Sequence, residues 1–481
     1  MNALALEEWI AAEARVAAAR MLRAISAVDL LMERPGFGQR VIPHPGSVLA
    51  SPVPAHYDPD PDYFFHWFRD SAIVIDALRI ALLEGYTERS GVDRFREFVQ
   101  FTRALHSLDG REFLERSNFR AHVQPAFLQY LRSDPEIAAL SGDSLLADVR
   151  VNADGTPDFI RWSRPQTDGP ALRCLALLRW WQQFPELRHD LTLKAALSDV
   201  INTDLAFTLG HVREPCGDIW EEQTGYHYYT QLLQAAALSS GAAWLEAGGE
   251  PAAAGAGRMA AEQTLALLDG FWSGDGGFYR SRSVTGKDPD IAVILAVLHA
   301  GRDSGRHSVL DPKVQATLTT LEELCEAEYA INRELAPGRG PALGRYANDL
   351  YYGGGAWFLA TLGAAEFYFR LAGVLCGSGA MPAVPANARF RQRLGAREAA
   401  TGADWARLAI ERGDALMRTV QAFTPASGEL SEQFDRSTGA QTSAKHLSWS
   451  YAAFITAAAS RAGATRPTGT ADPPSLLAGK A

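Results

Sequence analysis

Residues 313–326 read KVQATLTTLEELCE, and this stretch shows the pattern on which the fold prediction rests. Its apolar side chains recur at intervals of four, three and four residues, at Val314, Leu318, Leu321 and Cys325. That spacing places them on one face of an α-helix, and the glutamates of the stretch fall on the other side. The stretch therefore predicts an amphipathic helix with one buried face.

Two kinds of helical segment alternate along the chain, six of each. One kind is charged on one side, and the other is apolar over most of its surface. The charged, one-sided segments lie near 4–30, 90–107, 190–210, 258–270, 310–333 and 402–424. The apolar segments lie near 67–85, 168–184, 222–245, 288–300, 349–373 and 446–461. A helix that is apolar nearly all round is buried on all sides. The alternation therefore predicts an all-α (α/α)6 barrel of six helical hairpins with the apolar helices inside. Irregular helical packing is the alternative, whereas a solenoid is disfavoured because no repeat of fixed period is evident.

The domain organisation that follows is a single barrel over residues 1–462. The C-terminal stretch 463–481 is rich in proline and has little to bury, so we expect a flexible tail there. Long connections rich in Pro, Gly and Asp occur at 31–66, 108–167 and 375–400. Connections of this length are unusual unless they build a functional site.

Composition and charge narrow the class of protein. The chain has 481 residues, 47% of them hydrophobic and 21% charged, which is ordinary globular composition. Its net charge of −10 disfavours a nucleic-acid partner, because both carry negative charge and repel each other. The longest uncharged run, 223–245, contains His227 and several Gln and Ser residues, so we expect no membrane span. The sequence does not indicate an oligomeric state.

The charged N-terminal 25 residues do not look like a signal peptide, and the expected location is cytoplasmic. The four cysteines lie far apart, so buried free thiols are expected rather than disulfides or a zinc site. His66 and His227 lack the paired spacing of metal ligands, and we expect neither a metal nor a cofactor.

Clusters of polar and aromatic residues precede the apolar segments. In chain order they are PDYFFHWFRD (61–70), WSRPQTDGP (162–170), GDIWEE (217–222), GKD (286–288), GRY (344–346) and LSEQFD (430–435). In the second cluster, Asp168 is a candidate helix cap and Pro170 suits a first turn. In a barrel of hairpins these clusters all lie on one rim and converge on one site.

The residue types in these clusters suit a sugar. Aromatic rings cover the apolar face of a pyranose, and Arg and Asp bind its hydroxyl groups by charge-assisted hydrogen bonds. Two carboxyl groups can then act as proton donor and proton acceptor across a glycosidic bond. Glu221 and Glu432 belong to the third and sixth clusters, on opposite sides of a six-hairpin ring, which suits attack on a bond between them.

The sequence resembles the glucoamylases, the inverting exo-glucosidases of glycoside hydrolase family 15. The matching stretches are PDYFFHWFRDS, WSRPQTDGPALR, GDIWEEQTG, GKD, GRYANDLYYGGGAWFLATLGAAE and LSEQFDRSTGAQTSAKHLSWSYAAF. They follow one another in the family's order from about residue 60 to 455. The family fold is an (α/α)6 barrel, which agrees with the periodicity argument.

The resemblance implies a role for each matching residue. Glu221 matches the general acid, which protonates the glycosidic oxygen, and Glu432 matches the general base, which activates water. Inversion leaves room for that water, so we expect roughly 6.5–9.5 Å between the two carboxyl groups. Tyr63 matches a tyrosine that helps to hold this water. The residues implied to bind the sugar are Arg69, Asp70, Glu222 and Arg345. The residues implied to form the pocket wall are Trp67, Trp162, Trp220 and Trp449.

The resemblance implies an exo-acting α-glucosidase that acts on α-1,4 oligosaccharides. One departure bears on specificity: after Glu222 the family's Asn-Gly-Ser-Ser is replaced by Thr224-Gly225-Tyr226-His227. Bulky side chains at Tyr226 or His227 would favour short saccharides or α-1,6 links, as in isomaltose or dextran, and a trehalase is a related alternative. A disaccharide phosphorylase would need a basic pocket where Glu432 stands, and a binding protein without catalysis would not need both glutamates.

Overall fold

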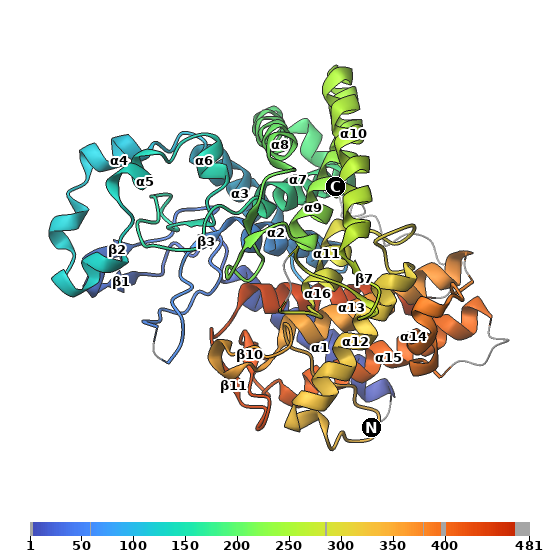
Figure 1. Cartoon of the computed structure of the whole chain (residues 1–481). Helices are drawn as coiled ribbons and strands as arrows, with labels where there is room; N and C mark the ends of the chain where they lie inside the picture. The colour runs from blue at the N-terminus through green and yellow to red at the C-terminus, as the bar shows by residue number, and fades with distance from the viewer. Residues whose placement is uncertain (1–2, 58, 284–285, 379, 396–400, 467–481) are drawn as a thin grey trace, which may run out of the picture.

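The inner ring of the molecule consists of six helices from the apolar segments (Figure 1). They are α2 (Phe68–Leu83), α7 (Asp168–Gln183), α9 (Tyr228–Ala247), α11 (Ala292–Ala300), α13 (Phe358–Ser378) and α16 (Ser448–Thr465). Each helix packs against the next in this order, and α16 packs against α2, which closes the ring. The computed structural model describes residues 3–57, 59–283, 286–378, 380–395 and 401–466.

Six further helices surround the ring and come from the charged, one-sided segments. They are α1 (Ala3–Leu22), α3 (Gly91–Leu105), α8 (Leu191–His211), α10 (Pro251–Leu268), α12 (Pro312–Glu328) and α15 (Gly402–Phe423). Each packs against at least one inner helix, and the two kinds alternate along the chain. The predicted (α/α)6 barrel is confirmed.

Helix α13 shows why the inner helices must be enclosed. Its side chains Leu362, Phe367 and Leu371 are fully buried, and it packs against α11, α15 and α16. The segment Phe358–Gly377 is long and apolar enough to cross a membrane, but 78% of its most apolar window is buried inside the protein. We therefore interpret it as a core helix.

A lobe beside the barrel is built from two of the long connections, 31–66 and 108–167 (left in Figure 1). Its elements are β1 (Met32–Arg34), η1 (Pro35–Phe37), β2 (Gln39–Val41), β3 (His66–Trp67), α4 (Gly110–Arg116), η2 (Phe119–His122), η3 (Pro125–Tyr130), α5 (Asp134–Ala138), α6 (Asp143–Leu146) and β4 (Arg150–Val151). A core of its own, which includes Phe37, Phe65 and Phe159, holds these short elements together. Trp67 belongs to this core and also to the strand that leads into α2, so the lobe is joined to the rim of the barrel.

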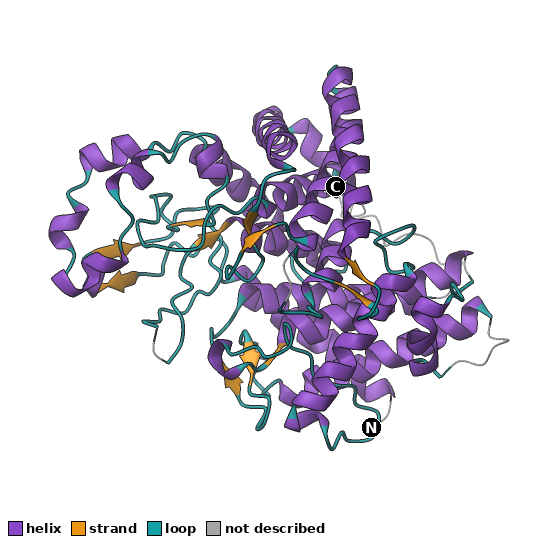
Figure 2. Ribbon diagram, in the orientation of Figure 1, coloured by secondary structure: helices purple, strands orange, loops and turns teal. Residues whose placement is uncertain are grey.

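The remaining strands are short and lie in connections between helices (Figure 2). They are β5 (Cys216–Gly217), β6 (Thr224–Gly225), β7 (Trp272–Ser273), β8 (Phe278–Tyr279), β9 (Ala356–Trp357), β10 (Gln433–Phe434) and β11 (Gln441–Thr442). β5 pairs with β6, β7 with β8, and β10 with both β9 and β11, all antiparallel. The other short helices are α14 (Ala388–Arg393), η4 (Pro185–His189), η5 (Asp269–Phe271), η6 (Ala330–Asn332), η7 (Tyr351–Gly353) and η8 (Pro385–Asn387).

Three inner helices begin later than the sequence pattern indicates. α9 begins at Tyr228 rather than near 222, α11 at Ala292 rather than near 288, and α13 at Phe358 rather than near 349. Before α9 the chain forms the β5–β6 hairpin, in which Asp218 Oδ1 accepts hydrogen bonds from the backbone N–H groups of Glu222 and Gln223. A side chain that satisfies backbone donors in this way favours a turn over a helix.

Smaller expectations also differ from the structure. Cys174, Cys216 and Cys325 are buried free thiols as predicted, but Cys376 is exposed near the end of α13. Helix α16 continues to Thr465, beyond the predicted end of the barrel at 462, and Arg466 donates a hydrogen bond to Glu84. The rest of the expected tail, 467–481, lies outside the described residues.

Glu13 on α1 generates a prediction about stability. Only 6% of the residue is exposed, and burial raises the pKa of its carboxyl group from 4.5 to about 7 although Arg20 opposes this shift. Between these two pH values the folded chain binds a proton that the unfolded chain has lost, so stability falls as the pH rises through this window. Glu13→Gln should therefore raise the melting temperature at pH 8 and have little effect at pH 4.5.

The exposed Glu8 on the same helix provides a matched control, since Glu8→Gln should leave the melting temperature nearly unchanged at both pH values. Thermal unfolding followed by circular dichroism measures all three proteins. A Glu13→Gln effect of equal size at both pH values would contradict the assigned origin of the shift.

Candidate active site

One cavity at the rim of the barrel brings the predicted site residues together. It encloses about 210 Å³ and opens where the chain enters the inner helices. All eleven predicted residues line it: Tyr63, Trp67, Arg69, Asp70, Trp162, Trp220, Glu221, Glu222, Arg345, Glu432 and Trp449. Residues from both ends of the chain and from the lobe thus share one site.

Glu221 lies in the turn of the β5–β6 hairpin rather than at the start of a helix. Its backbone has φ 63°, in the left-handed region, and this conformation directs the chain around the tight turn. Its Oε1 accepts hydrogen bonds from Trp67 Nε1 at 2.9 Å and Arg69 Nη2 at 2.8 Å. Trp162 Nε1 donates to Oε2. Three donors therefore fix the carboxyl group at the wall of the cavity.

The first turn of α2 supplies Arg69 and Asp70. The Arg69 guanidinium lies 3.3 Å from Asp70, 3.6 Å from Asp168 and 2.8 Å from Glu221. Asp168 is the first residue of α7, and its carboxylate faces Arg69 instead of acting as the predicted helix cap. Because a buried guanidinium is costly unless it is paired, these carboxylates keep Arg69 charged inside the pocket.

Asp70 lines the cavity, and its carboxylate oxygen Oδ2 lies 3.3 Å from Arg69 Nη2. Burial raises the pKa of Asp70 from 3.8 to about 6, although Arg69 opposes the shift. Within the described part of the chain its Oδ2 has no hydrogen-bond partner. A buried carboxylate oxygen of this kind is suited to accept a hydrogen bond from a hydroxyl group of a ligand.

Glu222 occupies a different set of contacts from its neighbour. Its Oε1 accepts hydrogen bonds from Arg345 Nη2 at 3.1 Å and the Tyr346 hydroxyl at 2.7 Å, and its Oε2 accepts one from Lys287. Burial alone would raise its pKa, but Arg345, Lys287 and Tyr346 together lower the pKa below its ordinary value. Glu222 is therefore an ionised acceptor at neutral pH.

Glu432 also lines the cavity and directly precedes β10 of the β9–β10–β11 sheet. The residue is only 3% exposed, and the hydroxyl group of Ser443 donates a hydrogen bond to its Oε2. Burial raises its pKa from 4.5 to about 7, against the opposing effect of Ser443 and Arg345. Glu432 can consequently bind and release a proton near neutral pH.

The aromatic wall includes two residues that the sequence argument missed, Tyr351 and Trp357. The rings of Trp220 and Trp357 lie 5.4 Å apart, and the Tyr351 hydroxyl is 2.6 Å from that of Tyr63. Trp357 directly precedes α13, as Trp67 precedes α2. That shared position before an inner helix was the signal that could have identified it.

The two bulky residues after Glu222 lie elsewhere. His227 is buried, with its Nε2 3.0 Å from the carbonyl oxygen of Cys216, and the side chain of Tyr226 is exposed. Among the described residues, neither belongs to the lining of the cavity. His66 accepts a hydrogen bond from the N–H of Val48, and burial lowers its pKa to about 3.

Across the described ranges, no group of three or more His, Cys, Asp and Glu side chains is placed to hold a metal ion. The polar groups that line the cavity are carboxyl groups, guanidinium groups, tyrosine hydroxyl groups and indole N–H groups.

A barrel pocket that combines aromatic walls with two separately held carboxyl groups is typical of glycoside hydrolases. The model of glycosyl hydrolases family 15 matches residues 146–459, well over half of the chain and including Glu221 and Glu432. The chain belongs to this family, and it is a glucoamylase-like glycoside hydrolase.

Individual relatives agree with the family assignment. The chain is 27% identical to glucoamylase 1 of Rhizopus oryzae over 88% of its own length and 69% of the relative. It is 29% identical to the glucoamylase of Neurospora crassa, over 88% and 64% of the two chains. The solved structure of the family 15 glucoamylase from Hypocrea jecorina superposes with a TM-score of 0.77 at 26% identity, covering 96% and 73% of the two chains.

The contact between Ser443 and Glu432 leads to a prediction. A hydroxyl group that donates to a carboxylate favours its ionised form, so Ser443→Ala should raise the pKa of Glu432 above about 7. Carbon-13 NMR of labelled glutamate side chains, with the signal assigned by Glu432→Gln, measures this shift. Ser437→Ala changes an exposed serine in the β10–β11 turn and should leave the signal unmoved. An unchanged pKa in Ser443→Ala would show that the hydroxyl group does not favour the ionised form.

Proposed function

We propose that this protein is an exo-acting α-glucosidase that releases β-D-glucose from the non-reducing ends of α-1,4-linked maltodextrins, with inversion at the anomeric carbon. The observation that carries the proposal is that Glu221 and Glu432 line one cavity but have separate partners. Glu221 contacts Trp67, Arg69 and Trp162, whereas Glu432 contacts Ser443. Different surroundings for two carboxyl groups allow one to act as acid and the other as base.

In the proposed reaction Glu221 donates its proton to the glycosidic oxygen. Glu432 accepts a proton from a water molecule that attacks the anomeric carbon from the opposite face. Glu432 must be ionised for this step, and its raised pKa of about 7 makes it a stronger base than an exposed glutamate. Tyr63, near Glu432, would help to orient the water.

The terminal glucose would bind against Arg69 and Asp70, whose charged groups suit sugar hydroxyls. Trp67, Trp162, Trp220 and Trp449 would cover its apolar faces. Glu222 and Arg345 would contact the next sugar.

Removal of either proposed catalytic carboxyl group tests the roles directly. Glu221→Gln and Glu432→Gln should each lower kcat by a factor of roughly 10²–10⁴, because amides cannot transfer the proton. Initial rates of glucose release from maltose measure the effect. Glu214→Gln alters an exposed glutamate on the connection that leads to β5 and should retain full activity. Full activity in either pocket variant would refute the assigned role.

A second experiment tests which glycosidic linkage the enzyme prefers and which anomer of glucose it releases. Proton NMR of fresh mixtures with maltose, isomaltose, maltoheptaose and trehalose identifies both the preferred bond and the first anomer formed. We expect β-glucose to appear first, and the α-1,4 substrates to react faster than isomaltose or trehalose. Early α-glucose would mean retention and would contradict inversion by Glu221 and Glu432. A preference for isomaltose or trehalose would contradict the proposed linkage. Sugar phosphate formed only in the presence of phosphate would indicate a phosphorylase.

A further inference from the structure

The guanidinium group of Arg150 is buried behind the aromatic wall of the cavity. Arg150 lies in β4, directly opposite Trp67 of β3, and the residue is 0% exposed. Its Cζ atom is 4.0 Å from the ring centroid of Phe65, 4.6 Å from that of Trp67 and 4.0 Å from that of Trp162. Arg150 therefore contacts the faces of two tryptophans that line the site.

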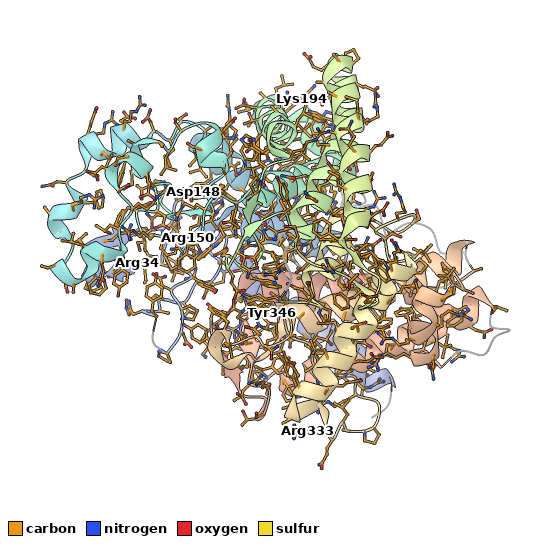
Figure 3. All side chains as sticks on the ribbon, viewed as in Figure 1. Arg34, Asp148, Arg150, Lys194, Arg333 and Tyr346 are labelled. Carbon is orange, nitrogen blue, oxygen red and sulfur yellow. The ribbon has the colours of Figure 1, made fainter. Side chains whose placement is uncertain are left out.

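The polar contacts of Arg150 are incomplete. Its Nε donates a hydrogen bond to Asp158 Oδ2 at 2.8 Å, but the two terminal nitrogens have no partner among the residues described. Asp158 is shared with Arg164, and Arg164 also contacts Asp148. Figure 3 shows Arg150 and Asp148 close together on the side of the barrel that carries the lobe.

The charge count around Arg150 leaves a positive excess at this wall. Asp148 also pairs with Arg132, so two aspartates in the cluster face three arginines. A buried, under-bonded cation is costly unless its surroundings compensate it. The faces of electron-rich rings provide that compensation, and a flat guanidinium group stacks on them better than an ammonium group does.

The two tryptophans that contact Arg150 also donate their indole N–H groups to Glu221. Trp67 donates to Oε1 and Trp162 to Oε2, so both oxygens of the carboxyl group depend on rings that Arg150 contacts. A cation on the face of an indole limits the rotation of the ring. It also withdraws electron density from the ring, which makes the N–H group a stronger donor.

We propose that Arg150 is a positioning residue for the reaction. Acting through the indoles of Trp67 and Trp162, it orients the carboxyl group of Glu221 and stabilises the carboxylate that forms when the proton passes to the glycosidic oxygen. Arg150 itself is outside the lining of the cavity that the described residues form, so it does not touch the sugar. The inference rests on the proposed role of Glu221 as general acid.

Other ionisable groups also surround Glu221 and must stay constant in the test. They are Arg69 and Asp70 from α2, Asp168 from α7, Tyr63 from the segment before β3, and the adjacent Glu222. None of these contacts Arg150 by a hydrogen bond or ion pair reported for the described residues. Substitution of Arg150 therefore changes one charge behind the tryptophans and leaves these groups in place.

The first test is kinetic. Arg150→Gln should lower kcat by roughly 10²-fold, the loss that a misplacement of about 1 Å causes, with KM nearly unchanged. Without the nearby cation the carboxylate that forms on Glu221 is less stabilised, so the loss should appear in kcat rather than in KM. Arg150→Lys keeps the charge without the flat stack, and its kcat should be intermediate.

Arg173 provides the matched control. It is also buried, pairs with Asp204 between α7 and α8 at 2.6 Å, and lies over the ring of Phe68 at 5.6 Å. Arg173→Lys should lower the melting temperature without moving kcat. A merely structural role of Arg150 would give this same pattern in Arg150→Gln and Arg150→Lys, and that result would overturn the inference.

The second test needs no substrate. Nitrogen-15 NMR reports the indole N–H groups, and Trp67→Phe and Trp162→Phe assign the two relevant signals. In Arg150→Gln these two signals should move, while those of Trp244 in α9 and Trp405 in α15 should not. If Arg150→Gln does not fold, Arg150→Lys is measured instead. If the two signals do not move, the inference about Arg150 is overturned, whether or not the enzyme hydrolyses α-glucosides. If they move but the wild-type protein is inactive on α-glucosides, only the proposed function is contradicted.

Discussion

Six helices that are apolar on nearly all sides must each be surrounded, and the rest of this structure depends on that requirement. A ring closed by contact between α16 and α2 encloses them, with the charged helices as an outer layer. Inside the ring an unpaired polar group is costly. The predicted site residues gather where the chain enters the inner helices, at the rim that carries the cavity.

Arg69 shows how charge is maintained at that rim. One guanidinium group connects Asp70 on its own helix, Asp168 on α7 and Glu221 on the β5–β6 turn. An unpaired guanidinium group would be costly in a buried site, and these carboxyl groups compensate its charge. The same contacts join two inner helices and a hairpin, so the network that supports the cavity also defines its shape.

Much of the fold followed from the sequence because helix periodicity is local. The alternation of one-sided and apolar segments identified all twelve barrel helices, and the outer α3, α8 and α15 begin and end within two residues of the predicted bounds. Some bounds of the outer helices also differ, since α1 ends at Leu22 rather than near 30 and α10 begins at Pro251 rather than near 258. At α9 the error occurs where a side chain competes for the backbone. The Asp218 side chain accepts hydrogen bonds from the backbone N–H groups of the residues at which a helix was predicted to begin. The spacing of apolar residues carries no information about this competition.

The sequence by itself determined the order of the helices, the burial of alternate ones and the set of eleven residues that share a rim. Only the tertiary structure decided which atoms pair. Glu221 meets Trp67 and Arg69 from more than 100 positions away, and Arg150 stacks on Trp162 through the fold of the lobe. Periodicity arises between neighbours three or four positions apart, whereas hydrogen bonds and ring contacts in the cavity depend on how distant segments are brought together.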